Sequence, residues 1–170
     1  MSVAFVSSLT FTFLSQIVYA TACAEGPATT ESAYGIPFQV TYSERFSAAG
    51  RTAGSFIKRD GRPRDHEVLA ARLIDRPLRP CFPAGWASET QVLAWVLSYD
   101  GAHMAEPLAI TAAGAALAVS DIPIAHAVAG ARVALLPADA VFEAGDPPGL
   151  PAPGGGWLVV NPTVAQVANR

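Results

Sequence analysis

The sequence predicts an α+β domain in which a mixed sheet packs with helices. Segments with strand character are followed by a segment with the helical period, and a second helical segment is followed by further strands. The chain has 170 residues, with a hydrophobic share of 51% and a charged share of only 15%. These shares provide enough apolar side chains for one sizeable core and exclude a highly charged disordered chain.

The N-terminal segment is mostly apolar and contains no lysine or arginine before Arg45. A secretory signal needs a positively charged start, and Ser, Thr and Gln side chains interrupt the apolar run before it could span a bilayer. The β-branched and aromatic content therefore favours buried strands over a signal or an anchor, and the cytoplasm or an organelle matrix over secretion. A secreted small domain stays the alternative, and a mature N-terminus near Cys23 would support it.

Three strands are expected in the first hundred residues. Residues 17–24 are typical of a short buried strand, and residues 36–44 alternate as a half-buried strand does. A polar loop marked by Gly and Pro separates them over 25–35. Residues 45–64 have neither period, which predicts a long loop, and the near-continuous apolar run over 90–99 predicts a central strand covered on both faces.

Two helices are expected between and after these strands. Asp65 is placed to act as the N-cap of a helix over 66–76 that Pro77 ends. A second helix, rich in alanine, is expected over 104–119. Its Gly114 indicates close packing on a sheet.

The last forty residues predict strands over 130–136 and 157–160, on either side of a Pro/Gly-rich surface loop at 137–156. Asn161 and Pro162 are typical of a helix start, which the end of the chain interrupts. We therefore expect the chain to be part of a larger domain.

The cysteines and histidines show no metal-binding pattern. Cys23 and Cys81 match no Cys-x-x-Cys or Cys/His spacing, and the three histidines stand at no ligand spacing, so no metal site is expected. Two free, buried thiols are favoured over a single disulfide, which stays open as the alternative. The histidines themselves are expected at helix caps and turns.

The charges are unevenly distributed along the chain. The net charge is −3, yet nine of the eleven Lys and Arg residues lie between Arg45 and Arg79, together with only four acids. Within this basic block Phe56 lies close to Lys58 and Arg59. Arginine binds phosphate bidentately and an aromatic ring stacks on a base, so the block suits an anionic partner such as RNA. The residues alone leave an equally good alternative of solvated arginines and intrachain ion pairs, for example with Asp75.

Four stretches resemble polynucleotide phosphorylase, in the first of that family's two RNase PH-like domains. They are YSERFSAAGR (42–51), GSFIKRDGRP (54–63), ARLIDRPLRP (71–80) and ITAAGAALAVSDIP (110–123). The resemblance covers residues 17–136 and extends weakly to 170. It implies that residues 17–170 form part of an RNase PH-like domain, incomplete at both ends, after an unmatched apolar segment over 1–16.

The resemblance implies a trimeric ring that degrades RNA from the 3′ end with inorganic phosphate, and Mg²⁺ for the full-length family. It places Phe56, Ile57, Lys58 and Arg59 at the entrance of a central RNA channel. The family has two aromatics followed by two arginines there, so Ile57 and Lys58 weaken both stacking and bidentate binding. The resemblance also implies that the phosphate site and the catalytic acids lie in a second domain that this sequence lacks.

We therefore expect the RNA-binding part of a 3′-to-5′ phosphorolytic exoribonuclease, with single-stranded RNA as its partner and without catalytic residues, a metal site or membrane contact. The candidate RNA-binding residues are Arg51, Phe56, Ile57, Lys58, Arg59, Arg62, Arg72, Arg76 and Arg79. The alternative function is a non-catalytic structural subunit, whose arginines would serve assembly with an active phosphorolytic ring.

Overall fold

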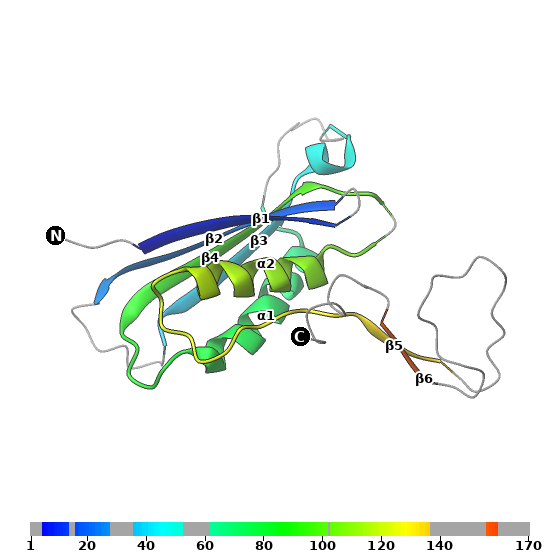
Figure 1. Cartoon of the computed structure of the whole chain (residues 1–170). Helices are drawn as coiled ribbons and strands as arrows, with labels where there is room; N and C mark the ends of the chain where they lie inside the picture. Colours follow the sequence, from blue (N-terminus) through cyan, green and yellow to red (C-terminus); the bar gives the residue numbers. More distant parts are fainter. Residues whose placement is uncertain are drawn as a thin grey trace. The chain divides into compact units, whose positions relative to one another are not determined.

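A computed structural model describes the chain in six stretches (Figure 1). They are residues 5–13, 16–27, 36–52, 62–101, 103–136 and 156–159. The chain divides into two compact units, Met1–Ala129 and Gly130–Arg170. The first unit contains a four-stranded sheet and two helices, and the second contains a two-stranded sheet.

The sheet of the first unit is mixed and has the strand order β1-β2-β4-β3. Its strands are β1 (Phe5–Phe13), β2 (Gln16–Pro27), β3 (Phe38–Glu44) and β4 (Ser88–Ser98). Antiparallel pairing joins β1 to β2 and β2 to β4, whereas β3 runs parallel to β4. The predicted α+β class and the three strands expected before residue 100 are confirmed. The strand character of the N-terminal segment is confirmed as well, but its burial was wrong for β1, because residues 6–12 of this edge strand are exposed or half-buried.

Helices α1 (Asp65–Leu78) and α2 (Glu106–Val119) lie on the same side of this sheet (Figure 1). The core between the layers depends on small side chains in the middle of the sheet. Ala20 and Ala94 are paired across β2 and β4 and are fully buried. Buried alanines of α2, among them Ala112 and Ala116, complete the layer. Short side chains on both layers allow the helix to approach the strands closely.

The outer face of the sheet differs from the prediction for residues 90–99. β4 is central, but it alternates between buried residues and half-buried or exposed ones, so a strand covered equally on both faces was wrong for the described residues. Trp95 is half-buried on the outer face beside Tyr19, at a ring-centroid distance of 6.2 Å, and Leu97 is exposed. β1 is an edge strand, and its Val6 is exposed.

The boundaries of α1 also differ from the prediction. The N-cap is Arg64 rather than Asp65, because Glu67 reaches back to accept the Arg64 N–H at 2.6 Å. Pro77 lies inside the last turn instead of ending the helix. Proline there removes one backbone donor, and α1 continues only to Leu78 before the chain tightens into a 3₁₀ turn, η2 (Arg79–Cys81).

Gly114 lies in α2 as predicted, but it packs against a loop rather than against a sheet. A Cβ atom at this position would lie 2.1 Å from the carbonyl oxygen of Val128, a backbone atom that cannot move away by rotating a side chain. Only glycine permits this approach.

The remaining expectations are partly tested. In the long loop predicted over 45–64, residues 46–49 form a 3₁₀ turn, η1 (Phe46–Ala49), and residues 53–61 lie outside the described residues. In the second unit β5 (Val133–Leu136) pairs antiparallel with β6 (Gly156–Val159), which confirms both strands with shifts at their ends. Most of the predicted loop over 137–156 and the helix start at 161–162 lie outside the described residues.

Both cysteines are free, as favoured from the sequence; Cys81 is buried and Cys23 half-buried. In the part of the chain that the structure describes, no helix is both long and apolar enough to cross a membrane.

Candidate nucleic-acid interface

The basic block begins where β3 ends and η1 follows. Gly50 closes η1 in the left-handed conformation, with φ of +66°, and its N–H donates to the carbonyl of Ser47 at 3.0 Å. The N–H of Arg51 donates to the Phe46 carbonyl at 3.0 Å. These bonds reverse the chain direction, so Arg51 is held next to η1.

Glu67 connects the start of α1 to the end of β3 through hydrogen bonds of its carboxylate. Its side chain is buried, one carboxylate oxygen accepts the Glu44 N–H at 2.8 Å, and the other accepts the Arg64 N–H. A buried carboxylate is costly unless it is satisfied, and here both of its oxygens accept a backbone donor. Glu67 is therefore a structural residue that positions the two arginine-bearing segments.

Glu44 is engaged on both of its oxygens as well. One accepts the Tyr42 hydroxyl at 2.8 Å, and the other lies 3.1 Å from His66 Nε2. Burial, and then the neighbouring Glu44, raise the pKa of Tyr42 above the ordinary tyrosine value, so its hydroxyl remains a neutral donor. The prediction that His66 lies at a helix start is confirmed.

The exposed side chain of Arg64, the N-cap of α1, also connects α1 to the end of β3. Its guanidinium lies 5.0 Å from the centre of the Phe46 ring, and Nη2 donates to the Glu44 carbonyl at 3.2 Å. Two hollows share this stack in their walls. The first, of about 230 Å³, includes Ser43, Arg62 and Glu67 in its wall.

The second hollow, of about 210 Å³, lies between η1 and the end of β4. Its wall contains three arginines, two aromatic rings and one acid among its members, namely Arg45, Arg51, Arg64, Phe46, Tyr99 and Glu44. Neither ring was identified from the sequence, because Tyr99 is distant from the basic block in the chain and Phe46 falls within an expected loop. The signal that could have found Phe46 is its place between Arg45 and Arg51.

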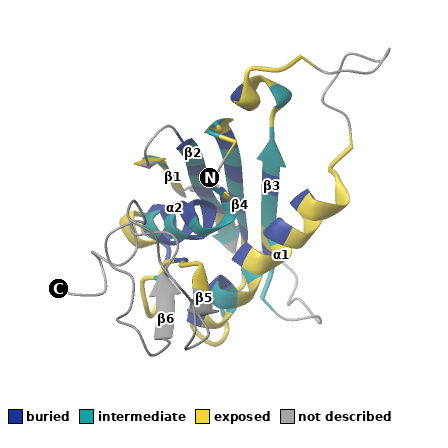
Figure 2. Ribbon diagram, turned by 90° about the vertical axis from the view of Figure 1, so that its right-hand side faces the viewer, coloured by how far each residue is buried: buried dark blue, intermediate teal, exposed yellow. Residues whose placement is uncertain are grey.

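The helical arginines present a basic strip on α1. Arg72 and Arg76 are both exposed and lie one turn apart, next to the exposed apolar side chains of Leu69 and Leu73. The exposed stretches of α1 are yellow in Figure 2. The neighbouring apolar and basic stripes therefore follow the predicted pattern, although the apolar stripe faces outward.

Arg79 is engaged within the chain. Its guanidinium binds the Asp75 carboxylate with two hydrogen bonds, at 2.8 and 3.1 Å. The same group donates to the carbonyls of Ile36 and Phe38 at 3.0 and 2.9 Å and lies over the Phe38 ring. This is an intrachain ion pair with Asp75 of the kind that the sequence left open. This clamp ties the end of α1 to the start of β3.

The structure therefore places Arg51 and Arg62 at the two hollows and Arg72 and Arg76 on α1. Four predicted residues, Phe56, Ile57, Lys58 and Arg59, lie outside the described residues. Among the described residues no group of three His, Cys, Asp or Glu side chains could hold a metal ion.

The fold and its surface define a small α+β module with a basic, aromatic-lined end. Residues 7–123 match the RNase PH family, described as the 3′ exoribonuclease family, domain 1, and the chain belongs to this family. The match includes residues 7–16, which the resemblance seen in the sequence did not cover. It also includes every described residue of both hollows and of α1.

Relatives with this domain carry a consistent name. The chain is 53% identical over 120 residues to the probable polyribonucleotide nucleotidyltransferase 1, chloroplastic, of Oryza sativa subsp. japonica, covering 71% of this chain and 13% of the relative. It is 45% identical over 150 residues to the polyribonucleotide nucleotidyltransferase of Protochlamydia amoebophila, covering 88% of this chain and 19% of the relative. The chain thus spans less than a fifth of the length of these two relatives.

A solved structure agrees on the fold. The crystal structure of rice Rrp46 superimposes with a TM-score of 0.51 at 21% sequence identity, covering 75% of this chain and 55% of that one.

Proposed function

We propose that this chain is the RNA-contacting part of a 3′-to-5′ phosphorolytic exoribonuclease acting in RNA processing and mRNA degradation, with single-stranded RNA as its partner. The observation that carries the proposal is the set of exposed arginines on a domain of the 3′ exoribonuclease family. Arg51, Arg62, Arg72 and Arg76 pair with none of the described carboxylates, so their charges are available to phosphates.

Three of the described acids near these arginines already have hydrogen-bond partners within the chain. Asp75 accepts hydrogen bonds from Arg79, and Glu67 accepts hydrogen bonds from two backbone N–H groups. Glu44 accepts the Tyr42 hydroxyl and lies beside His66. Carboxylates held in this way suit structural roles better than proton transfer to a leaving oxygen. Inorganic phosphate, Mg²⁺ and assembly into a trimeric ring belong, in this proposal, to the whole protein.

The test measures binding of a labelled single-stranded oligo(A) by fluorescence anisotropy at increasing salt. We expect weak, sequence-independent binding, whose log K falls with log salt by about 0.7 for every phosphate contact. Binding that is the same at low and high salt, or that is absent at low salt, contradicts the proposal.

The same sample tests whether the chain acts alone. We expect purified chain with phosphate and a divalent metal to bind the oligonucleotide but to release no nucleoside diphosphate. Phosphate-dependent shortening that is lost in Asp75→Asn would place the chemistry in this chain.

A second candidate function is a non-catalytic subunit that assembles with an active phosphorolytic ring. The exposed Leu69 and Leu73 beside Arg72 and Arg76 favour it, because neighbouring apolar and arginine side chains are typical of interfaces. Mixing the chain with a full-length homologue and measuring size by chromatography distinguishes the two. Co-elution supports assembly, and a chain that stays monomeric contradicts it.

A further inference from the structure

We propose that the hollow between η1 and the end of β4 binds one nucleotide unit of single-stranded RNA, with the base on Tyr99 and the phosphate at Arg51. This inference rests on the proposed function and assigns part of it to a specific site. Tyr99 was not among the candidate residues, and Arg51 was a candidate only as one charge among several.

The chemistry of the wall carries the assignment. Tyr99 is 39% exposed, so part of its ring is accessible, and Val96 lies beside it in the wall. Arg51 is exposed at the same hollow. An accessible ring beside an arginine offers a nucleotide both a stacking surface and a partner for its phosphate.

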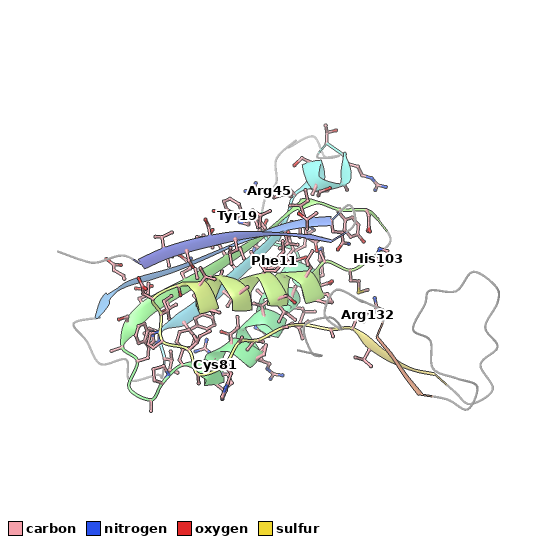
Figure 3. All side chains as sticks on the ribbon, viewed as in Figure 1. Phe11, Tyr19, Arg45, Cys81, His103 and Arg132 are labelled. Carbon is pink, nitrogen blue, oxygen red and sulfur yellow. The ribbon has the colours of Figure 1, made fainter. Side chains whose placement is uncertain are left out.

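The stack of Arg64 on Phe46 makes another part of the wall. Since the Arg64 guanidinium is already bonded to the Glu44 carbonyl and lies over the ring, this part is held in place before any ligand arrives. Arg45 also belongs to the wall and lies near Trp95, at 5.7 Å from the ring centre (Figure 3).

Backbone hydrogen bonds fix the two sides of the hollow to each other. The N–H of Tyr99, just after β4, donates to the Ala48 carbonyl in η1 at 2.9 Å. The N–H of Ala48 donates to the backbone carbonyl of Arg45 at 3.0 Å, which closes the turn of η1. A preformed wall reduces the ordering cost of binding, so a single nucleotide can contribute measurably.

The charge of the wall suits an anion in spite of its one acid. Glu44 is the acidic member, and its two oxygens face Tyr42 and His66. The Arg64 guanidinium lies 3.6 Å from the Glu67 carboxylate, whereas Arg51 pairs with none of the described carboxylates and brings its positive charge to the wall.

The experiment compares Tyr99→Ala with wild type on two probes, a short single-stranded oligo(A) and an abasic oligonucleotide of the same length. We expect Tyr99→Ala to weaken oligo(A) binding about five- to tenfold and to leave the abasic probe unchanged. Tyr99→Phe keeps the ring and should bind like wild type. Arg51→Gln should weaken both probes.

Val6→Ala is the matched control, since it removes an exposed apolar side chain from the edge strand β1. Circular dichroism confirms that each variant is folded. Free AMP should compete only weakly, and AMP binding as tight as that of the oligonucleotide overturns the assignment to RNA.

The outcomes separate the two proposals. If wild type binds neither probe, the proposed function fails, and the site fails with it. If wild type binds with strong salt dependence but Tyr99→Ala binds oligo(A) like wild type, or weakens both probes equally, the site is overturned and the proposed function stands.

Discussion

The two helices of the first unit have the same length but different roles. Each has fourteen residues, yet four are buried in α1 and eight in α2. α2 is mostly buried between the sheet and the loop at Val128, whereas α1 has an exposed face that carries arginines and leucines. α2 therefore contributes mainly to the core, and α1 leaves one face open to solvent, although both helices cover the same face of one sheet.

The largest change in the free energy of unfolding is expected from the same substitution, Leu→Ala, made in each of the two helices. Leu117 of α2 is fully buried, so Leu117→Ala should lower the free energy of unfolding by about 2–5 kcal/mol. Leu73 of α1 is 53% exposed, so Leu73→Ala should change it by no more than about 0.5 kcal/mol. Denaturant unfolding measures both, and equal losses would mean that the two helices do not differ in this way.

The next largest change in stability is expected at Gly114, on the side of α2 that packs against the loop at Val128. Helix propensity alone predicts that Gly114→Ala stabilises the protein by roughly 0.5–1 kcal/mol. The close approach of the Val128 carbonyl predicts the opposite, a loss of about 1–3 kcal/mol, because backbone must shift. We expect the clash to dominate, and Ala118→Gly, at an exposed position of α2, calibrates the propensity effect. A more stable Gly114→Ala would show that the loop does not pack there.

A smaller effect separates the structural arginine at the end of α1 from the exposed ones. Arg79→Gln loses the paired contact with Asp75 and the bonds to Ile36 and Phe38, which should cost about 1–2 kcal/mol of unfolding free energy, discounted for partial exposure. Arg76→Gln, on the exposed face, should change stability by less than about 0.5 kcal/mol. Thermal unfolding of the two variants measures the difference. Equal unfolding midpoints would show that the contacts of Arg79 with Asp75, Ile36 and Phe38 do not stabilise the fold.

Much of this architecture was predictable because strand alternation and helical period depend on residues that are close in the chain. The strand containing Tyr42 and the helix containing Ile74 both followed from such local patterns. Coverage of the outer sheet face around Trp95 was not predictable, since an apolar strand has the same pattern whether or not another layer covers it. The partner of Gly114 was missed for a related reason: a glycine indicates close approach but not the approaching group.

In the candidate site too, features that depend on neighbouring residues in the chain were predictable, and contacts between distant residues were not. Clustered charge identified Arg51, Arg62, Arg72 and Arg76, because charge along the chain can be counted directly. The engagement of Arg79 with the Ile36 carbonyl depends on contacts across more than forty residues, which spacing does not encode. Tyr99 joins the basic end only through the pairing of β4 with its neighbours and the bond to η1.

In the proposed function, the exposed basic surface of the first unit binds RNA. The most direct measurement is the salt dependence of oligo(A) affinity for Arg76→Gln beside Arg132→Gln, two exposed arginines of which only the first lies in the basic block. We predict that Arg76→Gln weakens binding and reduces the slope of log K against log salt by about 0.7, the loss of one phosphate contact. Arg132→Gln should leave both unchanged. An unaltered slope in Arg76→Gln, or an equal reduction in Arg132→Gln, would contradict the claim.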